Sequence, residues 1–134
     1  RYVESGKTKL VLKASDIPAP GAGIDLILAI EGANPLQSDL KHFDEVYQHG
    51  VRMITLAHYK PGGFCDVMTE QPKQKSLSDA GRKAVEKMDK LGIVIDVAHA
   101  SADALKQISN MWASAPMAGV TCLAGSKDTG TMPI

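Results

Sequence analysis

Aromatic residues are scarce in this chain, and no apolar run is long. Phe, Trp and Tyr make up 4% of the 134 residues, which disfavours the aromatic platforms that stack on single-stranded nucleic acid. Lys+Arg and Asp+Glu number 15 each, so the formal net charge is zero and no basic excess indicates a nucleic-acid partner. No apolar run approaches the roughly 20 residues that span a bilayer. The sequence therefore predicts neither a nucleic-acid partner nor a membrane segment.

Cysteine is equally scarce. Cys65 and Cys122 are the two cysteines, and their separation fits no zinc or redox motif. We expect buried thiols in preference to a disulfide between them. The polar residues 1–9, RYVESGKTK, do not resemble a secretory signal, and the sequence leaves the compartment open.

What the sequence does contain is a regular alternation of apolar runs and amphipathic stretches. Apolar runs bounded by turn residues predict strands over 23–32, 51–59, 93–100 and 118–125, and leave open a further strand over 8–18. Apolar residues at helical spacing predict helices over 38–50, 78–91 and 102–113. Strands that alternate with amphipathic helices are typical of a parallel sheet covered by helices, so we predict an α/β fold.

The predicted helices carry end signals. Ser76 and Asp79 have the spacing of a capping box at the start of the second helix, and Gly92 is suited to end it. Ser101 is suited to cap the third helix.

Polar side chains stand at the ends of three consecutive predicted strands: Glu31, His58 and His99. Because the carboxyl ends of parallel strands form the edge where ligands bind, we expect these side chains to converge. A glutamate and two histidines suit a divalent transition metal, most simply zinc. The alternative is that each histidine is a hydrogen-bonded residue of the rim and that Glu31 caps a helix or forms a salt bridge.

Four blocks of the sequence resemble, in order, the membrane (renal) dipeptidase family. They are LILAIEGANPL, LKHFDEVYQHGVRMITLAHY, SLSDAGRKAVEKMDKLGIVIDVAHAS and SAP, and they cover most of residues 23–116. The family consists of zinc metallopeptidases on an amidohydrolase-type (β/α)8 barrel. The resemblance implies that this chain is part of such a TIM-type barrel and acts on dipeptides.

The resemblance also implies a role for each matching residue. Glu31 matches a glutamate that bridges two zinc ions, and His99 matches a zinc ligand. His58 matches a histidine that contacts the substrate and the developing oxyanion, while a metal-activated hydroxide attacks the peptide carbonyl. Asp128 lies near the position of an aspartate that passes a proton to the leaving amine.

The sequence departs from the family in its remaining ligands. The His-x-Asp pair of the first barrel strand is absent, and so is a later histidine of a Ser-His-Ser segment. The tail resembles the last barrel strand instead, so a segment of roughly a hundred residues would be missing between Met117 and Ala118, given the usual barrel size. We therefore expect residues 1–134 to form a single partial barrel domain, either a piece of a larger protein or a rearranged relative.

Three functions remain open on these grounds. The first is a zinc dipeptidase, from which this chain alone retains little activity because ligands are missing. The second is a catalytically inactive binding or scaffold protein that keeps the dipeptidase-like surface. The third is another amidohydrolase-type hydrolase, for example one that opens lactones or cyclic amides. An open parallel sheet also has unpaired edges that favour a homo-oligomer.

Overall fold

The computed structural model describes residues 8–37, 39–60, 62–73 and 76–111. Within these residues, strands alternate with helices along the chain. The elements, in order, are η1 (Ala14–Asp16), β1 (Leu28–Glu31), η2 (Asn34–Leu36), α1 (Lys41–Gln48), β2 (Val51–Thr55), α2 (Asp79–Leu91), β3 (Val94–Asp96) and α3 (Ala102–Met111). None of the helices in this part of the chain is long and apolar enough to cross a membrane.

The three described strands form one parallel sheet in the order β1-β2-β3. Glu31 of β1 pairs with Thr55 of β2, and Thr55 pairs with Asp96 of β3. The last residues of the three strands therefore lie in one row at the carboxyl edge of the sheet. This arrangement confirms the predicted α/β class and the predicted parallel pairing.

The strands are shorter than the apolar runs that predicted them. The paired strands end at Thr55 in β2 and at Asp96 in β3, where the Thr55 hydroxyl also donates to the Asp96 carboxylate at 2.7 Å. One further backbone bond follows there, from the N–H of Leu56 to the carbonyl of Asp96 at 3.1 Å. The segment 8–18 forms no strand beyond a single parallel bridge between Leu10 and Leu26. The reason is local: the carboxylate of Asp16 accepts hydrogen bonds from the N–H groups of Leu12 and Lys13 and turns the chain back. The strand predicted over 118–125 lies outside the described residues.

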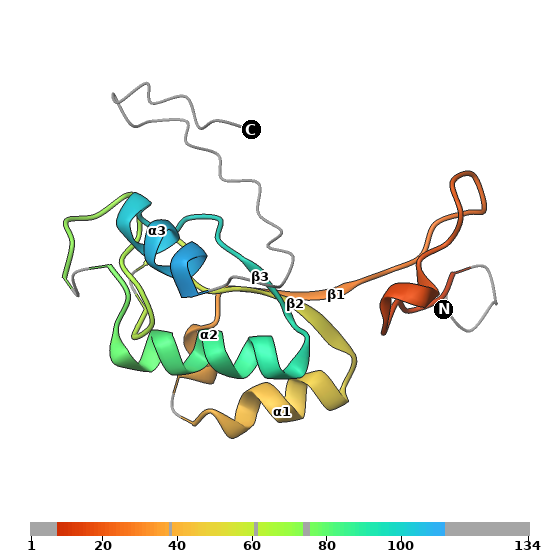
Figure 1. The fold of residues 1–134 in the computed structure, drawn as a ribbon, viewed down its shortest axis with the longest axis horizontal. Helices are drawn as coiled ribbons and strands as arrows, with labels where there is room; N and C mark the ends of the chain where they lie inside the picture. The colour runs from red at the N-terminus through yellow and green to blue at the C-terminus, as the bar shows by residue number, and fades with distance from the viewer. Residues whose placement is uncertain (1–7, 38, 61, 74–75, 112–134) are drawn as a thin grey trace.

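Helices α1 and α2 lie side by side and pack against the sheet (Figure 1). The rings of Phe43 on α1 and Phe64 meet edge to face with their centroids 6.0 Å apart. An ion pair of 2.6 Å between Lys87 Nζ and Asp44 Oδ1 joins the two helices at the surface. The largest fully buried apolar side chains come from the helices, the strands and the loops between them: Phe43, Phe64, Ile54, Leu56, Met88, Ile93, Ile95 and Ile108.

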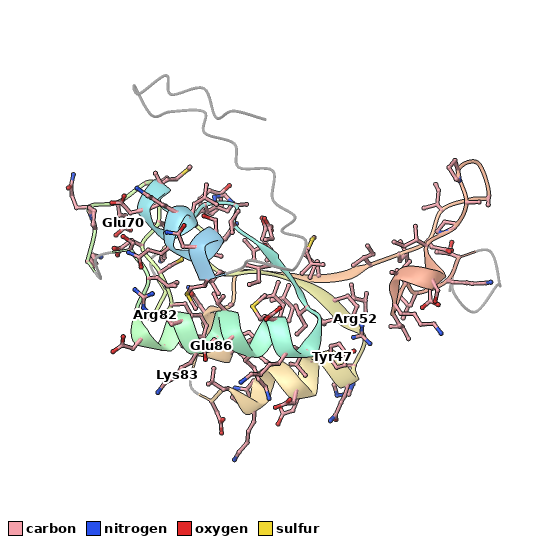
Figure 2. All side chains as sticks on the ribbon, viewed as in Figure 1. Tyr47, Arg52, Glu70, Arg82, Lys83 and Glu86 are labelled. Atoms are coloured by element: carbon pink, nitrogen blue, oxygen red, sulfur yellow. The ribbon has the colours of Figure 1, made fainter. Side chains whose placement is uncertain are left out.

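Arg52 at the start of β2 attaches the segment before β1 to the rest of the fold. Its Nε donates to the carbonyl of Leu12 at 2.8 Å, and its Nη1 donates to the carbonyl of Tyr47 at 2.8 Å. The guanidinium lies 3.8 Å from the centre of the Tyr47 ring, and Figure 2 shows the two side chains together at the end of α1. The segment nevertheless exposes several large apolar side chains, among them Ile17 and Ile24.

The start of α2 differs from the predicted capping box. Its N-cap is Ser78, whose Oγ accepts the N–H of Gly81 at 2.9 Å. Ser76 lies two residues earlier, and its N–H donates to the Asp66 carboxylate at 2.8 Å and not to Asp79, as a capping box would require. The predicted end at Gly92 is confirmed: this residue adopts φ 71°, a left-handed conformation that suits glycine at a helix end.

We expect Ser78→Ala to lower the free energy of unfolding by about 1 kcal/mol, the usual cost of losing a serine N-cap. Urea denaturation followed by circular dichroism measures the change. Ser109→Ala is the matched control, because Ser109 is exposed within α3 and its hydroxyl caps no helix start. Equal stability of the parent and the Ser78 variant would contradict the capping role.

Candidate metal centre

The side chains of Glu31, His58 and His99 meet at the carboxyl edge of the sheet. One potential ligand atom from each of the three lies within 4.8 Å of the others. The Nε2 of His58 is 3.2 Å from Oε1 of Glu31. The convergence expected from the sequence is therefore present in the structure.

The two histidines occupy equivalent positions after their strands. Glu31 is the last residue of β1, as predicted, but His58 and His99 each lie three residues beyond the end of β2 and β3. The prediction that the two histidines end the strands is therefore wrong, because each lies on a short loop that follows its strand. Because Thr55 and Asp96 are paired across the sheet, both loops leave the edge at the same level and bring the imidazoles together.

Asp96 shapes the loop that carries His99. Its Oδ2 accepts the hydroxyl of Thr55 at 2.7 Å, and its Oδ1 accepts the N–H of Ala98 at 2.9 Å. One carboxylate thus joins the end of β2 to the turn after β3. The sequence contained one signal for this role, an acidic residue inside the apolar run 93–100, three positions before His99.

His99 has a backbone conformation that few residues adopt. Its φ is 66°, in the left-handed region, which costs a residue other than glycine about 1–3 kcal/mol. Neighbouring backbone bonds hold it there: the N–H of Met68 donates to the carbonyl of His99 at 3.0 Å, and the N–H of Ser101 donates to the carbonyl of Asp66 at 2.9 Å. Ser101 also caps α3 as predicted, since its Oγ accepts the N–H of Ala104 at 3.2 Å.

Asp66 holds the segment that supports His99. Its side chain is buried, and its two carboxylate oxygens accept the N–H groups of Lys73 and Ser76 at 2.8 Å each. Next to it, Val67 pairs with Ala100 in an isolated antiparallel bridge. This role of Asp66 could not be predicted from the sequence, because an aspartate in a glycine- and proline-rich loop is usually solvated.

Gly32 allows the close approach of His58 to Glu31. Its φ is 95°, and a Cβ atom placed on it would lie 3.1 Å from the Cβ of His58. A larger residue after Glu31 would therefore be strained and would press on the imidazole. This steric requirement is a reason for the glycine that follows Glu31 in the block LILAIEGANPL.

The three side chains suit a divalent transition metal because of their ligand atoms and because an ion can reach them from solvent. Imidazole nitrogen and carboxylate oxygen are the ligands that zinc takes together in catalytic sites. The Glu31 side chain is 71% exposed and that of His58 is 31% exposed, so an ion can reach the centre from solvent. Cys65 is no further ligand, because burial, with a smaller effect of Asp66, raises the pKa of its thiol to about 12.

Asp128, predicted as the proton donor to the leaving amine, lies outside the described residues, as do Met117 and Ala118. The proposed missing segment between the latter two stays a prediction. Cys65 is free and buried, as expected, and Cys122 also lies outside the described part.

The family model and curated relatives that this chain matches are described as dipeptidases. The family model described as membrane dipeptidase (peptidase family M19) matches residues 4–120. An uncharacterised dipeptidase of Schizosaccharomyces pombe is 32% identical over 85 residues, which are 63% of this chain and 21% of that protein. Dipeptidase 3 of Mus musculus is 30% identical over 86 residues, 60% of this chain and 17% of that protein.

Solved structures resemble the chain in fold. The probable dipeptidase PvdM of Pseudomonas aeruginosa has a TM-score of 0.61 and 28% identity, with 66% of this chain and 24% of that one covered. A metallopeptidase of Rhodobacter sphaeroides, liganded with a phosphinate mimic of the dipeptide L-Ala-D-Ala, has a TM-score of 0.72 and 19% identity over 88% of this chain and 35% of that one.

The chain spans about a fifth of the length of the curated relatives it matches. With strands that are parallel and alternate with helices, these similarities confirm the predicted fold class, a portion of a (β/α)8 barrel.

Proposed function

The chain belongs to the membrane dipeptidase family, peptidase family M19, and on that premise we propose that it is part of a zinc-dependent dipeptidase-like hydrolase. Glu31 and His99 bind the metal in this proposal, and His58 binds the substrate. The observation that carries it is the meeting of these three side chains within 4.8 Å at the carboxyl edge of the sheet. In barrel enzymes this edge is where catalytic residues gather.

Each residue has a role that its position supports. Glu31 offers an exposed carboxylate, which can bridge two ions, and His99 offers an imidazole nitrogen from a loop held by backbone hydrogen bonds. The zinc ions, when bound, would supply an activated water and polarise the peptide carbonyl. The imidazole of His58 points its Nε2 at the centre, 3.2 Å from Glu31, where an N–H can donate to the oxygen that becomes negative.

The dipeptide as substrate class is supported by the family and by the neighbour from Rhodobacter sphaeroides, whose ligand is a dipeptide mimic. Asp128 remains the proposed donor of a proton to the leaving amine. A complete site for two ions needs more protein ligands than Glu31 and His99, and a metal held by two residues is bound less tightly than one held by three or four.

That shortage favours a second candidate function, a catalytically inactive binding protein with a dipeptidase-like surface. Within the described residues, the only group of potential ligands that meets is Glu31, His58 and His99. The two functions differ in turnover, because only the first needs the remaining ligands.

A titration of the purified chain with zinc, followed by a dipeptide hydrolysis assay, tests the proposal. We expect His99→Ala to weaken zinc binding more than tenfold, because a ligand is lost, and His58→Ala to keep zinc binding within about threefold while any turnover falls. Zinc binding without turnover by the parent would favour the inactive binding protein. A parent chain that binds no zinc at micromolar concentration would refute both the metal centre and the assigned roles.

A further inference from the structure

Tyr59 lies directly beside the candidate metal centre, yet the roles proposed above do not use it. Its ring centroid is 4.2 Å from that of His58 and 5.0 Å from that of His99, and it is tilted by 56° to both. The two imidazoles meet edge to face at 4.8 Å. The three rings thus form a contiguous aromatic cluster, in which Tyr59 is 65% exposed.

The loop that carries Tyr59 is attached on both sides. It begins directly after β2 ends at Thr55, and beyond Tyr59 the N–H of Gly63 donates to Oε1 of Gln37 at 2.6 Å. The carbonyl of Gly63 accepts the hydroxyl of Ser78 at 2.5 Å. Because Gln37 follows η2 on the segment that continues from Glu31, the loop is tied to the same edge of the sheet as the carboxylate. The Tyr59 ring itself is positioned by its contacts with the two imidazoles.

A large aromatic side chain that is mostly exposed beside a catalytic centre offers a surface for a ligand. One part of the ring packs on the imidazoles, while the accessible remainder can contact an apolar group. A substrate whose carbonyl oxygen contacted His58 would have its adjacent side chain close to the Tyr59 ring, because that ring packs on His58 with the centroids 4.2 Å apart. Lys60, next along the chain, is also exposed.

We propose that Tyr59 is a specificity-determining residue that forms the apolar wall of the subsite for the substrate side chain beside the scissile bond. The inference rests on the proposed function, and it adds the substrate class: dipeptides with a bulky apolar or aromatic side chain at that position are preferred to those with alanine. The preference arises from ring-to-side-chain contact, so it requires the aromatic ring and not the phenolic hydroxyl.

Calorimetric binding of two phosphinate dipeptide mimics to the zinc-loaded chain tests this inference without requiring turnover. One mimic has a methyl group beside the phosphinate and the other a benzyl group. We expect the parent to bind the benzyl mimic roughly 3- to 10-fold more tightly, the range that an aromatic contact supplies. Tyr59→Ala should bind both mimics alike, and Tyr59→Phe should keep the preference.

Ile17→Ala is the matched control, because Ile17 is as exposed as Tyr59 but lies on the segment before β1. It should keep the parent's preference. If Tyr59→Ala keeps the same ratio of affinities, the specificity role is overturned while the proposed function stands. If Tyr59→Ala loses zinc itself, Tyr59 supports the ligands instead, and the specificity role is also overturned. If the zinc-loaded parent binds neither mimic, the proposed function fails together with this inference.

Discussion

Replacing Glu31 by alanine is expected to weaken zinc binding by at least about 100-fold. Removal of groups that merely orient a ligand already costs 10- to 100-fold in metal affinity, and Glu31 is proposed to be a ligand with a full negative charge. It is also the only carboxylate among the three residues that meet at the centre. Titration with zinc, or with cobalt followed by its absorption spectrum, measures the loss.

Two further measurements separate this loss from unfolding. The Glu31 side chain is 71% exposed and its contact with His58 is open to solvent, so the free energy of unfolding without metal should stay within about 1 kcal/mol of the parent. Glu45→Ala removes an exposed glutamate from α1 and should leave zinc affinity unchanged. Parent-like zinc binding by Glu31→Ala would show that the metal, if bound, is held elsewhere.

Asp66→Ala is expected to lower the free energy of unfolding by about 2–6 kcal/mol. The substitution leaves the buried N–H of Ser76 and the partly buried N–H of Lys73 without an acceptor, and each group kept from water costs about 1–3 kcal/mol. The backbone around Asp66 also supports the loop of His99 through the bond from Ser101 N–H and the bridge between Val67 and Ala100. Zinc affinity should therefore fall with stability, although Asp66 is not a proposed ligand.

Asp66→Asn distinguishes the hydrogen bonds from the volume of the side chain. It keeps one acceptor oxygen, so about half of the loss should be recovered, or roughly 1–3 kcal/mol. Asp89→Ala, at an exposed position of α2, is the control and should change stability by less than about 0.5 kcal/mol. Urea denaturation of the three variants in parallel gives the comparison, and equal stability of Asp66→Ala and the parent would contradict the proposed support.

The sequence predicted the parallel strands and the helices well where the spacing of apolar residues agrees with the residues that cap or end a helix. Gly92 ends α2 as expected, and Ser101 caps α3. The prediction failed where a tertiary contact intervenes: the N-cap of α2 is Ser78 and not Ser76, whose N–H donates to the Asp66 carboxylate. The extent of β2 and β3 was also overestimated, since the paired strands end at Thr55 and Asp96 while the apolar runs continue to residues 59 and 100.

What the sequence by itself determined is the order of strands and helices and the identity of Glu31, His58 and His99 as side chains near three strand ends. Local patterns suffice for this, because the spacing of apolar residues and the positions of glycines depend only on residues close together in the sequence. Only the tertiary structure decided that the three side chains meet and that Asp96 and Asp66 hold the loop of His99. The same is true of the packing of the Tyr59 ring against both imidazoles. These features depend on hydrogen bonds and contacts between residues far apart in the chain, which no local period encodes.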